Sequence, residues 1–69
     1  MDKIRTETVR KYGHDGKLCT RTFRGRIAVY ENKKRLYSIM SDIERISRGD
    51  ALNDARQMAA DLLREANIN

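Results

Sequence analysis

The sequence lacks the residues on which most small secreted domains and zinc-binding domains depend. Cys19 is the only cysteine among 69 residues, so an internal disulfide and a thiolate zinc cluster are both excluded. Secreted domains of this size usually carry several disulfides, and we therefore expect a cytoplasmic protein. No apolar run approaches the roughly 18 residues that cross a membrane, and the first residues lack the apolar core of a signal peptide. We expect a soluble protein that makes no membrane contact.

Residues suited to catalysis are also scarce. His14 is the only histidine, and it lies in a glycine-flanked segment typical of an exposed turn. Cys19 has no catalytic partner in view and is best interpreted as a small core side chain. The sequence contains no glycine-rich phosphate loop, nucleophile motif or metal-ligand spacing. We expect no enzyme activity, no cofactor and no metal site.

What the sequence does contain is the pattern of a small sheet. Residues 3–12 mix β-branched and charged residues, which predicts an exposed or edge strand, and a turn is predicted over 13–16 because Asp-Gly favours positive φ angles. Residues 17–31 alternate with a period of two. Phe23, Ile27 and Val29 are predicted to face a helix, and Gly25 between them suggests a bulge or a close backbone approach.

A second hairpin is predicted at Asn32-Lys33-Lys34, because asparagine tolerates the left-handed conformation. Residues 35–46 fit either a strand or a helix by their apolar spacing. We favour the strand, because the preceding strand needs a partner after its turn. Ser41-Asp42 then marks a bulge or the end of the strand.

The last segment has the clearest helical pattern. Ser47 is predicted as the N-cap and Asp50 as the third residue of a helix over about 48–66. An apolar stripe recurs at helical spacing on Leu52, Ala55, Met58, Ala59, Leu62, Leu63 and Ala66. The predicted fold is therefore α+β: one domain over 1–69, with a three-stranded antiparallel sheet over about 3–46 packed against one C-terminal amphipathic helix (βββα).

Charge is distributed unevenly along the chain. Residues 1–35 contain eleven basic and four acidic residues, a net charge of +7, whereas residues 36–69 have a net charge of −2. If the helix covers one face of the sheet, Arg24, Arg26 and Tyr30 lie on the open face, with Lys33, Lys34 and Arg35 at its hairpin end. A two- or three-stranded sheet can enter the DNA major groove, where arginine reads guanine and lysine contacts phosphate. We expect binding to nucleic acid, in particular duplex DNA. A purely solvated polar face is the simpler alternative.

The segment RLYSIMSDIERISRGDALNDARQMAADLLREA, with Asp54-Ala55 and Ala59 in its helix, resembles the arm-type DNA-binding N-terminal domain of tyrosine integrases. The resemblance spans roughly residues 18–66. It implies a three-stranded sheet inserted in the major groove, with base and phosphate contacts falling on Arg21, Arg24, Arg26 and Lys33 to Arg35. By analogy, a domain of this size and composition resembles accessory proteins of phages and prophages.

A second functional class stays open on the sequence. The exposed strand over 3–12 can accept a strand from another chain, and Tyr12, Tyr30 and Tyr37 belong to a residue type enriched at protein interfaces. This favours an interaction module or an inhibitor of a host protein, acting through the edge strand or as a homodimer.

Overall fold

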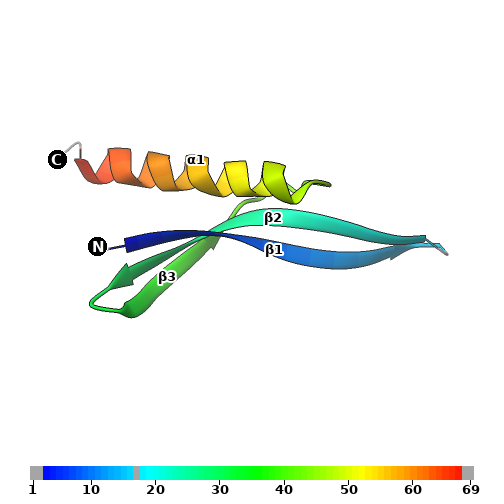
Figure 1. The fold of residues 1–69 in the computed structure, drawn as a ribbon, viewed down its shortest axis with the longest axis horizontal. Coiled ribbons are helices and arrows are strands. Elements are labelled where there is room, and N and C mark those ends of the chain that lie inside the picture. Colours follow the sequence, from blue (N-terminus) through cyan, green and yellow to red (C-terminus); the bar gives the residue numbers. More distant parts are fainter. Residues whose placement is uncertain (1–2, 17, 68–69) are drawn as a thin grey trace.

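The computed structural model describes residues 3–16 and 18–67, and for 14, 15, 18, 19 and 67 it describes the backbone. The side chains of His14 and Cys19 thus lie outside the described part. The chain forms β1 (Lys3–Asp15), β2 (Leu18–Glu31), β3 (Lys34–Met40) and α1 (Arg48–Asn67). The strands make one antiparallel sheet in the order β1-β2-β3, and α1 lies over one of its faces (Figure 1). The predicted βββα fold is confirmed.

The core lies where the middle of β2 passes under α1. Ile27 and Val29 are each only 1% exposed, and both lie on the face that the alternation of β2 assigned to the helix. Ala28, between them, is also fully buried although it belongs to the opposite face. Beneath the helix, Ala51 and Ala55 complete the buried apolar set among the described residues. The core is thin because most of its members are small.

Gly25 brings the helix directly onto the backbone of β2. A Cβ atom at this position would overlap the carbonyl oxygen of Ala51 and lie 2.7 Å from the amide nitrogen of Ala55. Both alanines are fully buried, so two short side chains and a glycine let the two backbones meet. The predicted close approach at Gly25 is confirmed.

The two hairpins differ in how well their turns were predicted. Asn32 and Lys33 adopt positive φ angles of 52° and 68° between the paired residues Glu31 and Lys34, as a type I′ turn requires. The turn predicted over 13–16 is wrong in extent. β1 continues to Asp15, which pairs with Leu18, and only Gly16 among the four has a positive φ, of 65°.

The end of the sheet also differs from the prediction. Residues 35–46 are not one strand, because β3 ends at Met40. Ser41 still donates its backbone N–H to Gly25, at 2.8 Å, and Arg45 returns to exchange two 2.7 Å backbone hydrogen bonds with Phe23. Between them the chain bulges away from β2, with the Ser41 hydroxyl accepting a hydrogen bond from the Ile43 amide. The alternative of a helix over this stretch is excluded.

The helix begins at Arg48, as the N-cap prediction for Ser47 requires, and the Ser47 carbonyl accepts a hydrogen bond from the Ala51 amide. Its apolar stripe is only partly covered. Ala55 is buried and Leu62 is half-buried, but Leu63 and Ala66 are exposed, contrary to expectation. The helix packs on β2 and β1 and leaves β3 beside it.

The molecule is elongated, with extents of 50 × 23 × 16 Å. Its length comes from the β1–β2 hairpin, which extends well beyond the start of α1 (Figure 1). We call residues 9–15 and 18–24 of this hairpin the arm. In the described part of the chain, no helix is long and apolar enough to cross a membrane.

Candidate nucleic-acid interface

The structure separates the predicted binding residues into two groups. Arg21 and Arg24 lie on the arm, whereas Tyr30, Lys33, Lys34 and Arg35 lie around the turn at the opposite end of β2. A strand rises about 3.3 Å per residue, so Arg21 and Tyr30 are roughly 30 Å apart. The predicted residues therefore form no single compact patch, and Arg26 lies between the two groups.

Arg26 is largely engaged within the protein. Its Nε and Nη2 atoms donate to the same carboxylate oxygen of Glu7, at 2.9 and 2.6 Å, from directly opposite positions on β1 and β2. Both side chains are half-buried. A charge-assisted pair of this kind stabilises the sheet. Because the Glu7 carboxylate neutralises the guanidinium group, Arg26 is poorly placed to bind an anionic ligand.

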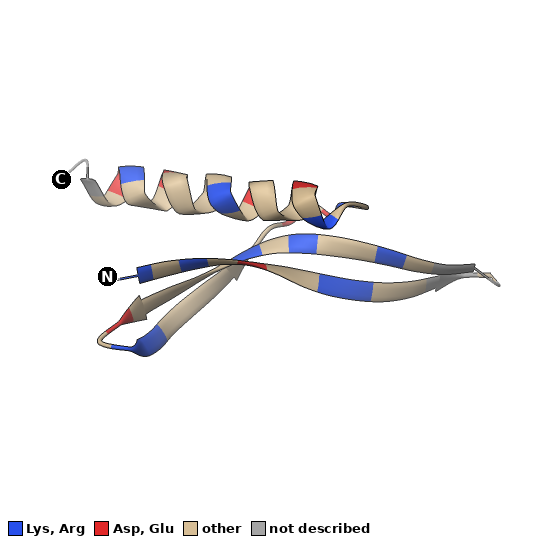
Figure 2. Ribbon diagram, viewed as in Figure 1, with Lys and Arg blue, Asp and Glu red and all other residues tan. Residues whose placement is uncertain are grey.

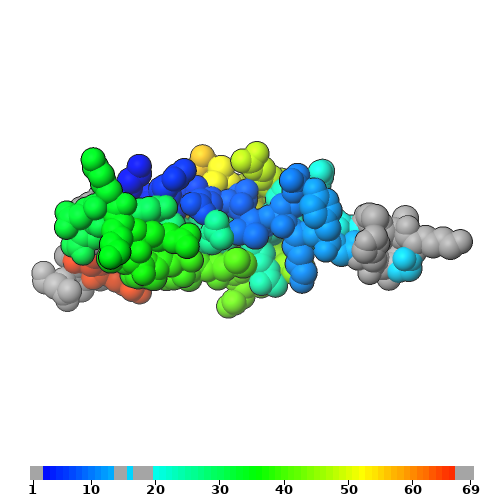
Figure 3. All heavy atoms as spheres, turned by 90° about the horizontal axis from the view of Figure 1, so that it is seen from below, coloured from blue at the N-terminus to red at the C-terminus, as the bar shows by residue number. Residues whose placement is uncertain are grey.

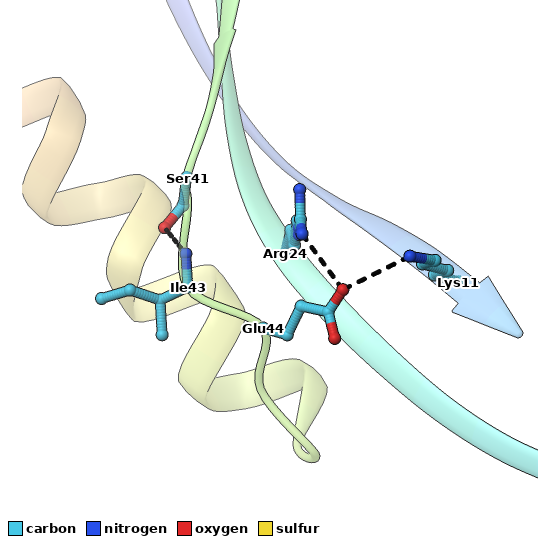
Figure 4. Close-up of polar contacts among 5 residues, drawn as sticks. All are labelled: Lys11, Arg24, Ser41, Ile43 and Glu44. Atoms are coloured by element: carbon cyan, nitrogen blue, oxygen red, sulfur yellow. Dashed lines mark hydrogen bonds and ion pairs between the residues drawn. The ribbon is translucent and has the colours of Figure 1, made fainter. Parts of the chain in front are cut away.

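Arg24 is held more loosely. One nitrogen, Nη2, donates to Glu44 at 3.1 Å, and Lys11 approaches the same Glu44 oxygen at 3.6 Å (Figure 4). Glu44 comes from the bulged segment after β3, so one carboxylate lies between two arm cations. The Nε atom of Arg24 is buried without a hydrogen-bond partner, whereas the Nε atom of Arg26 donates to Glu7. The Arg24 pair is therefore the easier of the two to exchange for another anion.

The other face of the arm carries a checkerboard of arginines and aromatic rings. Arg10 pairs with Phe23 across the strands, and Tyr12 pairs with Arg21. Along each strand, the Arg10 guanidinium lies 5.2 Å from the centre of the Tyr12 ring, and that of Arg21 lies 5.7 Å from the Phe23 ring. Stacking orders a guanidinium while its in-plane N–H donors stay available. We call these four residues the checkerboard.

A shallow depression lies where the checkerboard meets the helix. It has a volume of about 300 Å³ and is lined by Thr8, Arg10, Phe23 and Arg48. Arg48 is the first residue of α1, and its Nε donates to the Thr8 hydroxyl at 3.3 Å. Two guanidinium groups and the positive end of the helix dipole thus face one small space, which favours an anion.

A larger depression lies at the other end of the sheet. Its volume is about 500 Å³, and it is lined by Lys3, Arg5, Tyr30, Asn32 and Lys33. Here two predicted residues, Tyr30 and Lys33, meet two basic residues from the start of β1. Lys3 and Arg5 were not among the predicted binding residues. Their register opposite Tyr30 and Ala28 would have identified them once strand pairing was known.

The arm carries net positive charge on a thin element. Residues 9–15 and 18–24 contain four basic residues and one acidic residue. Figure 2 shows basic positions along both arm strands, away from the acidic positions of α1. Arg10, Lys11, Tyr12 and Arg21 are all exposed. Of these, only Arg21 was predicted to bind nucleic acid, because only pairing with β2 places the β1 residues beside Arg21 and Arg24.

Among the described residues, no group of three or more histidine, cysteine, aspartate or glutamate side chains is placed to hold a metal ion. No family model, no curated protein and no solved structure matches the chain.

Proposed function

We propose that the protein binds duplex DNA through the arm. The observation that carries the proposal is the checkerboard of Arg10, Tyr12, Arg21 and Phe23, which begins at the start of α1 and continues onto the two-stranded ribbon that extends beyond it. Two strands lie about 4.8 Å apart, and the major groove, about 12 Å wide, admits such a ribbon.

Both faces of the arm carry positive charge, which suits an element placed between two phosphate backbones. The checkerboard face presents Arg10 and Arg21, and the opposite face presents Lys11 and Arg24. Stacked guanidinium groups can read the O6 and N7 atoms of guanine, and the lysine can contact phosphate. In this proposal Arg26 stabilises the sheet, and the basic turn around Lys33 makes secondary backbone contacts.

A pair of matched double variants tests the proposal. Arg10→Gln/Arg21→Gln removes two positive charges from the arm, and Arg56→Gln/Arg64→Gln removes two from exposed positions of α1. The affinity for a mixed-sequence duplex is measured by fluorescence anisotropy at about 50 and 200 mM salt. We expect the arm variant to bind about tenfold or more weakly at low salt, because both guanidinium contacts with the duplex are lost.

The α1 variant should keep an affinity close to that of the wild type, because its changed residues lie away from the arm. Equal losses in the two variants would mean that only the net charge matters and would contradict the assignment to the arm. No binding by the wild-type protein at low salt would refute the proposal altogether.

A further inference from the structure

The β3 edge and the segment after it carry most of the exposed apolar surface of the described residues. Among the described residues eight large apolar side chains are exposed, and six of them fall within residues 36–46: Leu36, Tyr37, Ile39, Met40, Ile43 and Ile46. All seven residues of β3 are exposed. A long apolar edge strand without cover is a surface that other strands can pair with.

β3 extends the core face of the sheet past the edge of the helix. Ile27 and Val29 of β2 are the two largest fully buried side chains. On β3, Ile39 pairs with Ile27 and Tyr37 pairs with Val29. Tyr37 and Ile39 therefore point to the core face of the sheet, yet they remain 44% and 43% exposed because α1 lies over β2 and β1. In the view of Figure 3, β3 covers one end of the molecule and the arm extends to the other, while the segment after β3 returns beside Phe23 and Arg24.

The backbone of β3 is also open at this edge. Ser41 hydrogen-bonds to Gly25, and in an antiparallel ladder such inward-pointing residues alternate with outward-pointing ones. The N–H and C=O groups of Ser38 and Met40 therefore point away from β2. β1, the other edge, carries charged residues at Lys3, Arg5 and Glu7, which discourage pairing, whereas the middle of β3 carries none.

The surface area of the chain exceeds that of a compact monomer of its size. The accessible surface is 5491 Å², whereas a compact 8.0 kDa monomer has about 4,500 Å². The radius of gyration is likewise 14.2 Å against about 11 Å for a compact chain of this length. The excess is shared between the projecting arm and the uncovered β3 edge, and a standard protein interface buries roughly 800 Å² on each partner.

We propose that β3 pairs with β3 of a second copy of this chain, giving a two-fold homodimer with a continuous six-stranded sheet. An antiparallel pairing centred on Ser38 is self-complementary. It places Leu36 opposite Met40 and Tyr37 opposite Ile39, and it brings the basic start of β3, at Lys34, toward the acidic segment that follows β3 in the other copy, at Asp42. Each contact occurs twice, as an isologous interface requires, so the chain's own residues supply the complement that the edge needs.

Sedimentation equilibrium of the full chain between about 5 and 500 µM tests the dimer. We expect the wild type to approach twice 8.0 kDa and Ile39→Lys/Met40→Lys to sediment as a monomer, with the dissociation constant raised by about 100-fold or more. Tyr12→Lys is the matched control, since it replaces an exposed apolar residue of the arm, and it should leave the dimer intact.

A second variant guards against a simple loss of folding. Ser38→Pro removes a backbone N–H that points away from β2, so it should block pairing between copies while the circular dichroism spectrum stays that of the wild type. A wild type that remains monomeric to 500 µM, or a dimer unaffected by the β3 variants, would overturn the proposal. No DNA is present in these measurements, so their outcome is independent of the proposed DNA binding.

Discussion

At the scale of single residues, the availability of an arginine side chain for a ligand depends on the carboxylate that lies beside it. Arg24 and Arg26 occupy equivalent alternate positions on β2, yet Arg26 meets Glu7 with two nitrogens and Arg24 meets Glu44 with one. Glu44 also approaches Lys11. The single carboxylate of Glu44 therefore reduces the positive potential of one arm face, where the proposed function needs it.

Replacing Glu44 should consequently strengthen DNA binding. We expect Glu44→Gln to raise the affinity for duplex DNA about three- to tenfold at about 50 mM salt, since two cations are freed and a charge that repels phosphate is removed. An exposed pair contributes at most about 1 kcal/mol to stability, so folding should be little affected. Glu65→Gln on α1 makes the same change in net charge away from the arm. An equal gain in both variants would contradict the local role of Glu44.

A second carboxylate acts on stability. Arg45 donates from Nε and Nη2 to the two oxygens of Asp54, at 2.8 and 3.0 Å, and so joins the bulged segment to α1. The hydrogen bond from Arg45 holds the pKa of Asp54 below its usual range, and the same bond raises the pKa of Arg45. The pair therefore makes the folded state more stable when Asp54 is ionised.

This predicts a loss of stability in acid. The folded protein binds a proton at Asp54 less readily than the unfolded chain, whose aspartate pKa is about 3.9, so the contribution is complete above that pH and is lost as the pH falls through the lower folded value. Urea unfolding of the wild type and Asp54→Asn should differ most at pH 7 and pH 5, and the difference should shrink towards pH 3. A difference that stays constant with pH would contradict this role.

At the scale of elements, one glycine sets the position of the helix on the sheet. Gly25 allows α1 to rest on β2 at Ala51 and Ala55. The helix is thereby placed over β2 and β1, and both the arm and β3 are left uncovered. The two proposed interaction surfaces are the parts of the sheet that this placement does not cover.

Adding one methyl group at this contact should be strongly destabilising. We expect Gly25→Ala to lower the free energy of unfolding by about 2–3 kcal/mol, because its Cβ would meet backbone atoms that cannot rotate away. Gly49→Ala is the matched control. Its Cβ would meet only the Ser47 hydroxyl, at 3.6 Å, so it should be neutral or stabilising by up to about 1 kcal/mol.

Both glycine variants should be unfolded in urea at one fixed protein concentration, because association would stabilise the folded state by mass action. Similar stabilities for the two variants would show that the helix can move away from β2 without cost.

At the scale of the molecule, its two ends have different chemistry. The arm end is basic and narrow, whereas the opposite end combines the apolar residues of β3 with a basic turn. Pairing through β3 would bury its apolar edge and leave an arm at each extremity of the assembly. Duplex binding by two arms would then raise the apparent affinity through effective concentration, provided that both reach the same duplex.

Local sequence signals determined the elements themselves. The alternation in β2 identified Ile27 and Val29 as core, Asn32 marked a hairpin turn, and Ser47 marked the start of α1. These features depend on backbone conformation and on side-chain period, which neighbouring residues set. The close approach at Gly25 was also predictable, because a glycine inside a regular strand suggests contact with another backbone.

Tertiary structure decided what the sequence left open. β3 ends at Met40 because Ser41, Arg45 and Asp54 hold the next residues in a bulge, and those partners are distant in sequence or on another element. Strand register placed Glu7 on Arg26 and brought Arg10 beside Phe23. The sideways position of α1 on the sheet decided which basic and apolar residues stay exposed. That position follows from one backbone contact, and contacts between elements leave no periodic trace in the sequence.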